Sequence, residues 1–509
     1  MPKTFYLTTT LPYVNADPHI GFALEIIQAD ALARYHRLLG EEVVFNTGTD
    51  EHGLKIYRKA LENHEDPQTY CDRYAARFDA LKQALNLSYT NFIRTTDDHH
   101  TKATQEFWLR CFKNGDIYKK NYKIKYCVGC ELEKTDSELV DDKCPVHPNL
   151  KIELIEEENY FFKFSKYKKP LLKFYKKNPS FVVPGNRLQE IKNFVERGLE
   201  DFSISRLKSK MPWGIQVPND EDHVMYVWFD ALINYISTLG WPNDEKKFKN
   251  FWPGVQVAGK DNLRQQSAMW QAMLMSADLP ASKQIFIHGF ITSDGQKMSK
   301  SLGNVVDPFE LVEKYGSASS PRVGTDAVRY FLLGALPPDD DGDFSIERFE
   351  KFYTAHLVNG VGNLTSRILT MIEKYCDSRV PDGKAEDIGH KTEEFWKRFN
   401  AYFSEYKFDE IVKLVNGFVA ELDTLISEEK PWEKIKNGVN IQPMLYQLAE
   451  SLRQIALALL PIIPETAENI LSQLGIDADK LDILEKEIER GKLKSGAKIR
   501  KSGILFPRL

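Results

Sequence analysis

The chain has 509 residues, about three times the length of an average domain, so we expect two to four domains. Hydrophobic residues make up 42% of it and charged residues 28%, which is typical of a chain that buries several cores and argues against disorder. A net charge of −5 excludes a protein that coats polyanions through overall positive charge, although it leaves local basic patches open.

The first elements alternate between strand and helix. Residues 4–9 are rich in β-forming types, and a helical pattern of apolar residues follows from Leu24 to Tyr35. A second apolar strand, Val43-Val-Phe45, leads into Thr47-Gly-Thr-Asp50. A strand, a helix and a strand in this order predict a βαβ unit with a parallel sheet.

A segment without this rhythm interrupts the sheet. It begins near Asn121 with a cysteine-bearing stretch, and the alternation returns near Val224, with further strands expected around Val257 and Ile285. We therefore predict an α/β fold, a Rossmann-like parallel sheet split by a metal-bearing insertion. Beyond about Phe349 helical patterns predict an all-α helix bundle, at residues 357–372, 408–426 and 444–460.

These patterns divide the chain into six parts. The expected parts are the first half of a nucleotide-binding domain (1–120), a connective insertion (121–225), the second half of the nucleotide-binding domain (226–305), a linking segment (306–350), a helical domain (351–475) and a C-terminal tail (476–509). The most apolar stretch, residues 455–463, is far shorter than the roughly 20 residues that span a bilayer, and the N-terminus lacks an apolar signal core. We therefore expect a cytosolic protein without membrane contact.

Three of the six cysteines lie within 18 positions of one another. Cys127 and Cys130 are separated by two residues, as are Cys144 and His147, and this pair of knuckles is typical of a tetrahedral zinc site. Four protein ligands leave no coordination position open for a substrate, so we predict one structural Zn²⁺ and not a catalytic one. The alternative is a set of unrelated thiols in a loop.

Two segments carry residues suited to phosphate. In the first, His19 and Gly21 stand where a strand end meets a helix start, and free N–H groups and the helix dipole attract phosphate there. The second, Asp294 to Gly303, holds Lys297 and Lys300 in a loop that can close on a triphosphate. A plain turn with a surface histidine, or a solvated loop, would explain either segment alone.

Taken together, His-x-Gly after the first strand and Lys-Met-Ser-Lys-Ser after the last strand resemble class I aminoacyl-tRNA synthetases. Other segments are similar to the methionyl-tRNA synthetase family, namely Leu11-Pro-Tyr-Val-Asn15, Gly48-Thr-Asp-Glu-His-Gly53, Val227-Trp-Phe-Asp-Ala231 and the ending Leu505-Phe-Pro-Arg-Leu509. This resemblance implies an enzyme that activates L-methionine with ATP and Mg²⁺ to methionyl-adenylate and releases pyrophosphate. Methionine would then be transferred to the 3′ end of tRNA(Met).

The resemblance also implies roles for the residues that match the family's motifs. The catalytic residues would be His19, Gly21, Lys297 and Lys300. The ATP-binding residues would be His19, Gly21, Asp261, Lys297, Met298, Ser299, Lys300 and Ser301. The methionine-binding residues would be Leu11, Tyr13, Asp50, Trp228, Ala231, Tyr235 and Gln266. The anticodon-binding residues would be Asn363, Arg367, Pro431 and Trp432.

Physical chemistry supports this assignment and leaves alternatives open. Asp50 would pair with the ammonium group of the amino acid, and aromatic walls suit a thioether, which has polarizable bulk and accepts hydrogen bonds weakly. Single-stranded bases are read by stacking and by hydrogen bonds to their edges, which suits Trp432 and Arg367. Without the neighbouring matches, Tyr13, Trp228 and Tyr235 would be ascribed to core packing. Asn363 and Arg367 would be ascribed to an ion-paired helix face.

Two residues depart from the family pattern. Phe22 stands where the nucleotide motif usually ends in a second histidine, which leaves open how the transition state is stabilised. Gln266 stands where the family often has histidine, which leaves open the shape of the methionine pocket. These departures motivate one competing function, a catalytically weak tRNA-binding paralogue. The other competing function is a leucyl, isoleucyl or valyl synthetase. Those enzymes resemble this chain but carry a large editing domain, for which the insertion is too short.

Other patterns are better explained by structure than by chemistry. Gly254 to Lys260 is spaced like a P-loop but lacks the following Ser or Thr, and Asp339 to Glu350 lacks the glycine of a calcium loop. Asp97 to His100 predicts a helix start, and the lysines between 163 and 177 predict a solvated face, with tRNA contact as the alternative. Only 34 residues follow Gly475, so we expect a monomer.

Overall fold

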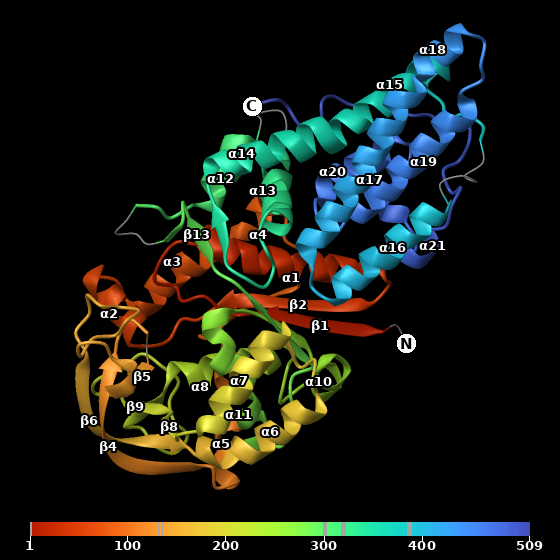
Figure 1. The fold of residues 1–509 in the computed structure, drawn as a ribbon. Coiled ribbons are helices and arrows are strands. Elements are labelled where there is room, and N and C mark those ends of the chain that lie inside the picture. Colours follow the sequence, from red (N-terminus) through yellow and green to blue (C-terminus); the bar gives the residue numbers. More distant parts are fainter. Residues whose placement is uncertain (1–2, 131, 135, 299–302, 317–321, 384–388) are drawn as a thin grey trace.

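The computed structural model describes residues 3–130, 132–134, 136–298, 303–316, 322–383 and 389–509. A parallel sheet with helices on both faces forms one part of the molecule, and a bundle of helices forms the other (Figure 1). A smaller antiparallel sheet extends from the part that holds the main sheet. The predicted α/β fold with an insertion and a following helical bundle is therefore confirmed.

Six parallel strands form the main sheet in the order β3, β2, β1, β11, β12, β7. Their bounds are β1 Thr4–Thr9, β2 Glu42–Thr49, β3 Asn91–Arg94, β7 Val182–Val183, β11 Val255–Gly259 and β12 Gln284–His288. In β1, Thr8 pairs with Asn46 on one side and with Gln256 on the other. β1, β2 and β11 are buried over nearly their whole length, because helices cover both faces of the sheet.

Helices connect the strands of the first half. They are α1 Ile20–Leu38, α2 Leu54–Glu62, α3 Pro67–Asp79, α4 Leu81–Ala84 and α5 Asp98–Lys113. α1 is buried along most of its length because it lies between the sheet and the bundle (Figure 1). α5 begins directly after Asp97, as predicted for the acidic segment there.

The insertion is built on a sheet with the strand order β5, β4, β6, β8. Its elements are β4 Ile117–Cys127, β5 Leu132–Lys134, η1 Asp136–Glu138, β6 Glu153–Phe162, η2 Phe164–Tyr167, α6 Lys168–Lys177, α7 Gly185–Arg197, β8 Phe202–Ser203, β9 Ser205–Leu207 and β10 His223–Met225. β4 and β6 form a long antiparallel ribbon from Ile117 to Tyr126, and the cysteine segment follows at the end of β4. This ribbon carries the candidate metal-binding side chains at its end, where Tyr126 and Val128 pack with Tyr13 and Trp228.

Two strands differ from the pattern expected from the sequence. β7 comes from within residues 121–225, yet it extends the main sheet by pairing with β12. β10, which contains Val224, pairs with β9 instead of joining the main sheet. Strands of two or three residues are too short to show a periodicity, so their partners are set by tertiary packing.

The second half of the sheet leads into a small sheet with the order β14, β13, β15. The elements are α8 Val227–Ala231, α9 Asn234–Ser237, α10 Glu245–Phe251, η3 Lys260–Asn262, η4 Gln265–Met269, α11 Trp270–Ser276, β13 Ile291–Ser293, β14 Gln296–Lys297, α12 Pro308–Tyr315, α13 Arg322–Gly334, β15 Gly342–Phe344 and α14 Ile346–Phe352. Residues 255–259 form β11, so the segment spaced like a P-loop is a strand, as predicted.

The bundle has helical structure over the three ranges predicted from periodicity, but residues 357–372 span two consecutive elements and the backbone at Gly360 is not helical. Its elements are η6 Tyr353–Gly362, α15 Asn363–Tyr375, α16 Gly389–Ser404, α17 Phe408–Glu429, α18 Pro431–Lys436, α19 Gln442–Leu459, α20 Pro464–Gln473, η7 Ala478–Lys480 and α21 Leu484–Glu487. Within the ranges given above, no helix has both the length and the apolar character that crossing a membrane requires.

Two hydrophobic clusters lie on opposite faces of the main sheet. Along β1, Phe5 and Leu7 belong to one cluster and Tyr6 to the other, because alternate side chains of a strand point to opposite faces. The first cluster continues from α1 through α13 into the bundle, where it includes Leu369 and Leu452. The sheet and the bundle therefore bury apolar surface against each other.

Candidate active site and metal centre

The candidate site lies where the strand order of the main sheet reverses. β1 and β2 run to one side and β11 and β12 to the other, so the loops that leave β1 and β11 diverge. Open α/β sheets bind ligands at such an edge. His19 follows β1, Asp50 follows β2 and Asp261 follows β11, so residues far apart in the sequence meet at this edge.

His19 caps the N-terminus of α1. Its Nδ1 accepts a hydrogen bond of 3.1 Å from the backbone N–H of Gly21. A neutral imidazole whose Nδ1 accepts carries its proton on Nε2. Crowding by the surrounding protein removes water from the ring and lowers the pKa of His19, which favours this neutral form. The exposed residue therefore offers an N–H donor at a helix N-terminus, where an anion is stabilised.

The two flanks of the lysine loop meet the start of α1. A Cβ atom at Gly21 would lie 2.9 Å from Cε1 of His19 and 3.9 Å from Cε of Met298. On the other flank, the backbone N–H of Ile20 donates to the carbonyl of Val306 over 3.0 Å. Residues that are nearly 300 positions apart are thus adjacent, and the missing side chain at Gly21 leaves room for the ring of His19.

The loop itself begins in the small sheet. β14 ends at Lys297 and pairs with β13, where Thr292 lies opposite Lys297. Ser299, Lys300 and Ser301 lie outside the described residues. The structure thus fixes the place at which the loop leaves and rejoins the fold.

Phe22 belongs to the hydrophobic core. Its ring meets the ring of Phe78 edge-on, with centroids 5.3 Å apart, and packs against the cluster that contains α1. A phenyl ring has no hydrogen-bond donor for phosphate. Within this motif, His19 alone carries a side-chain donor.

Asp261 lies in an exposed turn directly after β11. Its Oδ1 accepts a hydrogen bond of 3.2 Å from the side-chain amide of Asn262. An exposed carboxylate beside the end of a strand can accept hydrogen bonds from hydroxyl groups, as binding of a ribose requires.

A buried pair that the sequence analysis missed lies beneath this edge. Nε2 of His288, at the end of β12, contacts Oε2 of Glu25 on α1 over 2.9 Å. The other oxygen of Glu25 accepts from the backbone N–H and the hydroxyl of Thr10, over 2.8 and 2.6 Å. Burial lowers the pKa of His288, but Glu25 outweighs it and the pKa is raised overall. The pair ties α1 to the ends of β1 and β12.

The candidate methionine residues line the neighbouring part of the edge. The backbone N–H of Asp50 donates to the carbonyl of Pro12 over 3.0 Å, and its carbonyl accepts from Val14 over 3.3 Å. This pairing places Tyr13 beside Asp50, and the rings of Tyr13 and Trp228 meet edge-on with centroids 6.4 Å apart. The half-buried Leu11 precedes this segment and the buried Ala231 follows Trp228 on α8.

Tyr235 and Gln266 are joined by a hydrogen bond in the interior. Nε2 of Gln266, on η4, donates to the hydroxyl of Tyr235 over 2.7 Å, and its Oε1 accepts from Gln256 over 2.8 Å. Burial raises the pKa of Tyr235, so its hydroxyl stays protonated. Gln266 thus uses both the nitrogen and the oxygen of its side-chain amide, and it joins Tyr235 to Gln256 in the interior.

Two further side chains of the Asp50 segment are held by other elements. Glu51 forms a two-point ion pair with Arg94, of 2.6 and 2.9 Å. Nδ1 of His52 contacts Oδ2 of Asp230, on α8, over 2.6 Å. Both partners stand in segments that carry the family resemblance, but 178 positions separate them, so the sequence gives no sign of the contact.

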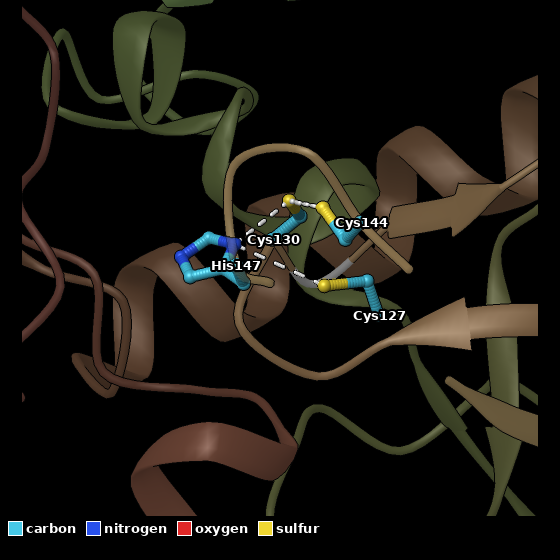
Figure 2. A group of neighbouring side chains, drawn as sticks. All are labelled: Cys127, Cys130, Cys144 and His147. Carbon is cyan, nitrogen blue, oxygen red and sulfur yellow. Dashed lines mark hydrogen bonds between the residues drawn. The ribbon is translucent and has the colours of Figure 1, made fainter. Parts of the chain in front are cut away.

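Four side chains of the insertion form a cluster suited to a metal (Figure 2). The potential ligand atoms of Cys127, Cys130, Cys144 and His147 all lie within 4.8 Å of one another. Sγ of Cys130 is 3.5 Å from Sγ of Cys144 and 3.2 Å from Nδ1 of His147. Edges near 3.5 Å, about the spacing expected around a tetrahedral metal with bonds of about 2.0–2.3 Å, fit a borderline-soft divalent ion.

Gly129 allows the two knuckles to approach. A Cβ atom at this position would lie 2.5 Å from Cγ of His147 and 2.8 Å from a methyl carbon of Leu150. Residues 127–130 form a tight turn at the end of β4. The ring of His147 lies against this turn, so a side chain here would displace one of the ligands.

The candidate anticodon residues lie in the bundle. Asn363 and Arg367 stand one turn apart on α15, and both contact Asp423 of α17. Arg367 forms an ion pair of 2.6 Å, and the amide of Asn363 is 3.5 Å from the same carboxylate. Pro431 is buried at the first position of α18, whereas Trp432 is 37% exposed. Figure 1 shows α18 at the end of the bundle farthest from the main sheet.

The comparisons with known proteins agree over the whole chain. A family model described as "tRNA synthetases class I (M)" matches residues 5–151 and 132–369, and one described as "Anticodon-binding domain of tRNA ligase" matches residues 386–494. The chain is 44% identical to methionine–tRNA ligase of Thermosynechococcus vestitus, over 93% of this chain and 90% of that one. It is 42% identical to the enzyme of Caldanaerobacter subterraneus subsp. tengcongensis, over 100% of this chain and 79% of that one.

A solved structure agrees with the sequence comparison. Mycobacterium tuberculosis methionyl-tRNA synthetase in complex with methionyl-adenylate superposes with a TM-score of 0.93 at 36% identity. The match covers 99% of this chain and 100% of the other. Sequence and fold thus agree from end to end, and the chain belongs to the methionine–tRNA ligase family of class I aminoacyl-tRNA synthetases.

Proposed function

We propose that this chain is a methionine–tRNA ligase, which activates L-methionine with ATP and transfers it to the 3′ end of tRNA(Met). The observation that carries the proposal is the contact of both flanks of the lysine loop with the start of α1. His19 at the N-terminus of a helix and the two flanks of a loop that carries two lysines then lie together at the edge of the sheet. Such groups suit the triphosphate of ATP.

In the first step, a carboxylate oxygen of methionine attacks the α-phosphorus of ATP, and the bond from that phosphorus to the departing pyrophosphate breaks. His19 would donate its Nε2–H to a phosphoryl oxygen, and Lys297 and Lys300 would neutralise the charge that develops on pyrophosphate. Gly21 would give the phosphates access to the backbone of α1, and Asp261 would hold the ribose. Most of the rate acceleration would come from positioning and charge stabilisation.

Methionine would be recognised at its two ends. Asp50 would pair with the ammonium group. The side chain would lie against aromatic and aliphatic groups, which suit a polarizable thioether. The proposed walls of this pocket are Leu11, Tyr13, Trp228, Ala231, Tyr235 and Gln266. The hydrogen bond between Gln266 and Tyr235 supports the proposal, because it fixes the hydroxyl at the base of the pocket.

The bundle would read the anticodon of tRNA(Met). Trp432 is exposed enough to stack on a base, and Pro431 sets the start of its helix. Asn363 and Arg367 would hydrogen-bond to base edges. Their shared contact with Asp423 holds the two side chains on one face of α15 until a base replaces the carboxylate.

The metal cluster would hold one structural Zn²⁺. Three thiolates and one imidazole complete a tetrahedral shell and leave no position for a substrate. Bound zinc would fix the end of the β4–β6 ribbon and take no part in the reaction.

Exchange of labelled pyrophosphate into ATP tests the proposal. The purified protein should catalyse exchange with L-methionine and not with L-leucine or L-cysteine, and it should then charge tRNA(Met). Exchange that depends on leucine or cysteine would change the substrate assignment. Binding of tRNA without exchange for any amino acid would support a tRNA-binding paralogue instead.

A further inference from the structure

The segment that carries Asp50 is held at its next residue by a buried ion pair. Glu51 is fully buried although it carries a carboxylate. Arg94 donates to it from Nε and Nη2 over 2.6 and 2.9 Å, and the hydroxyls of Thr49 and Thr96 donate over 2.7 and 2.5 Å. A buried charge with this many donors keeps one conformation, because any other would leave it unpaired in the interior.

The backbone of Glu51 is fixed as well. Its N–H donates to the hydroxyl oxygen of Thr95 over 3.0 Å. Its carbonyl accepts a hydrogen bond of 2.6 Å from the indole of Trp213. Both peptide groups that follow Asp50 are therefore oriented by residues from distant parts of the chain.

His52 attaches the segment to α8. Nδ1 of His52 and Oδ2 of Asp230 are 2.6 Å apart, and the two side chains are 8% and 0% exposed. Burial raises the pKa of Asp230, but His52 and His100 outweigh it and hold the pKa below its ordinary value. Asp230 is thus an ionised acceptor, and His52 donates to it. A short charge-assisted hydrogen bond of this kind also fixes the orientation of the two side chains.

Asp230 stands between two residues of the proposed thioether pocket. Trp228 precedes it on α8 and Ala231 follows it. The bond from His52 to Asp230 therefore joins the strand end that carries Asp50 to the helix that carries the pocket wall.

We propose that His52 and Asp230 are positioning residues that hold the carboxylate of Asp50 at a fixed place relative to the side-chain pocket. The inference rests on the proposed function, since it takes Asp50 as the partner of the ammonium group. Such a site binds only a ligand whose ammonium group and thioether are separated by the distance between Asp50 and the side-chain pocket. A misplacement of about 1 Å at a binding group can cost about 100-fold in rate, so a fixed frame for Asp50 matters to catalysis.

His100 provides a matched control. Its Nε2 lies 2.8 Å from the other carboxylate oxygen of Asp230, and it is fully buried. It belongs to α5, however, and its Nδ1 contacts the hydroxyl of Ser237 on α9. Removing His100 takes a similar bond from the same carboxylate and leaves the link to the Asp50 segment in place.

The test compares His52→Ala, His52→Asn and His100→Ala in the methionine-dependent exchange assay. Loss of one charge-assisted bond, about 1.4 kcal/mol or more, predicts a KM for methionine that rises at least about tenfold in His52→Ala. The KM for ATP should stay within about twofold, because the ATP groups stand on other loops. Asparagine places an amide nitrogen near the position of Nδ1, so His52→Asn should restore most of the affinity.

A second measurement separates positioning from general loss of structure. We expect His100→Ala to keep the KM for methionine within about threefold of wild type even where its Tm falls as far as that of His52→Ala. Inhibition by 4-(methylthio)butanoate, which lacks the ammonium group, should change little in His52→Ala. If His52→Ala does not fold, His52→Leu takes its place in each comparison, because leucine keeps bulk at this position and removes the donor to Asp230.

An unchanged KM for methionine in His52→Ala would overturn the inference. Equal rises for methionine and ATP, an equal rise in His100→Ala, or an equal loss of inhibition by the des-amino compound would also overturn it. In all of these outcomes wild type still supports methionine-dependent exchange, so the proposed function stands. Absence of that exchange in wild type would overturn the proposed function and this inference together.

Discussion

His19 and Gly21 act as one unit at the start of α1. Nδ1 of His19 accepts the N–H of Gly21, and this leaves the Nε2–H of the neutral ring available to another acceptor. The arrangement depends on the missing side chain, because a Cβ atom would meet the ring at 2.9 Å. A methyl group at Gly21 would therefore displace the His19 ring, which is the proposed phosphate donor, and leave the imidazole chemically unchanged.

Gly21→Ala should lower kcat/KM for ATP in the exchange assay by about 100-fold, because the His19 ring is displaced from its position. Gly417→Ala is the matched control, since it adds the same methyl group in helix α17 and meets nothing within 4 Å. The control should keep full activity and gain about 0.5–1 kcal/mol of stability from its helix propensity. Near-normal exchange by Gly21→Ala would show that this position tolerates a side chain.

Asp326 is a buried carboxyl group between the sheet and the bundle. Its Oδ2 accepts a hydrogen bond of 2.7 Å from the backbone N–H of Thr466, in the first turn of α20. Burial raises the pKa of Asp326 to about 6, although Thr466 and the guanidinium of Arg329 oppose the shift. An unfolded aspartate has a pKa of about 3.9, so between about pH 4 and pH 6 the folded chain holds one more proton than the unfolded chain.

This shift predicts that wild type loses stability as pH rises from about 4 to about 6, by an amount on the order of 2 kcal/mol. Asp326→Asn keeps an acceptor for Thr466 and removes the charge. Its Tm should match that of wild type near pH 4 and exceed it near pH 7.5. Thermal unfolding at several pH values measures the difference, and a constant offset across this range would contradict the assigned pKa.

At the scale of single elements, we expect the end of the β4–β6 ribbon to depend on a metal bound by the cysteine and histidine cluster. Several apolar side chains near its end are exposed, among them Val140, Leu150 and Leu154, so this end buries little of its own. A structural zinc site contributes on the order of 10 kcal/mol to a segment of this kind. The main sheet has its own two cores and does not share this dependence.

Cys144→Ser should therefore lose bound metal and expose residues 121–155 to protease, while helices of the bundle keep their protection from hydrogen exchange. The control is Cys376→Ser, which removes a half-buried thiol outside the cluster. We expect one zinc per chain in wild type and in the control. Metal analysis that finds none in freshly purified wild type would reject the site.

At the scale of the whole molecule, a buried arginine joins the catalytic part to the bundle. Arg329 on α13 contacts Asp30 of α1 over 2.8 Å and donates to the carbonyls of Pro461 and Ile462 over 3.3 and 2.8 Å. A buried arginine with all of its partners in place does not tolerate sliding of one part over the other. Packing therefore holds the distance between the proposed anticodon surface and the proposed adenylate site.

Because the two sites are far apart and rigidly joined, they should be separable by mutation. Trp432→Ala should lower kcat/KM for charging of tRNA(Met) by about 10- to 100-fold, since loss of one stacked base costs about 1–3 kcal/mol. Exchange of pyrophosphate should stay within about twofold of wild type, because the described residues proposed to bind ATP and methionine belong to the edge of the main sheet and not to α18. Leu425→Ala, at a side chain with the same 37% exposure on α17, is the control and should charge tRNA normally.

The sequence by itself determined the large features of this protein. The strand–helix–strand rhythm, the helical periodicity after Phe349 and the spacing of Cys127, Cys130, Cys144 and His147 predicted the split sheet, the bundle and the metal cluster. Such features are local, because spacing along the chain already fixes which side chains share a face or a turn. The family resemblance supplied the remaining site residues, and their roles stay proposals.

Tertiary structure decided what depends on long-range contact. The place of β7 in the main sheet, the link between His52 and Asp230 and the pairing of Glu25 with His288 leave no trace in spacing. Each of these joins residues more than 100 positions apart. A buried charge or a short apolar strand is stable only beside a suitable partner. Which partner it meets is decided by the packing of the whole chain and cannot be read from one segment.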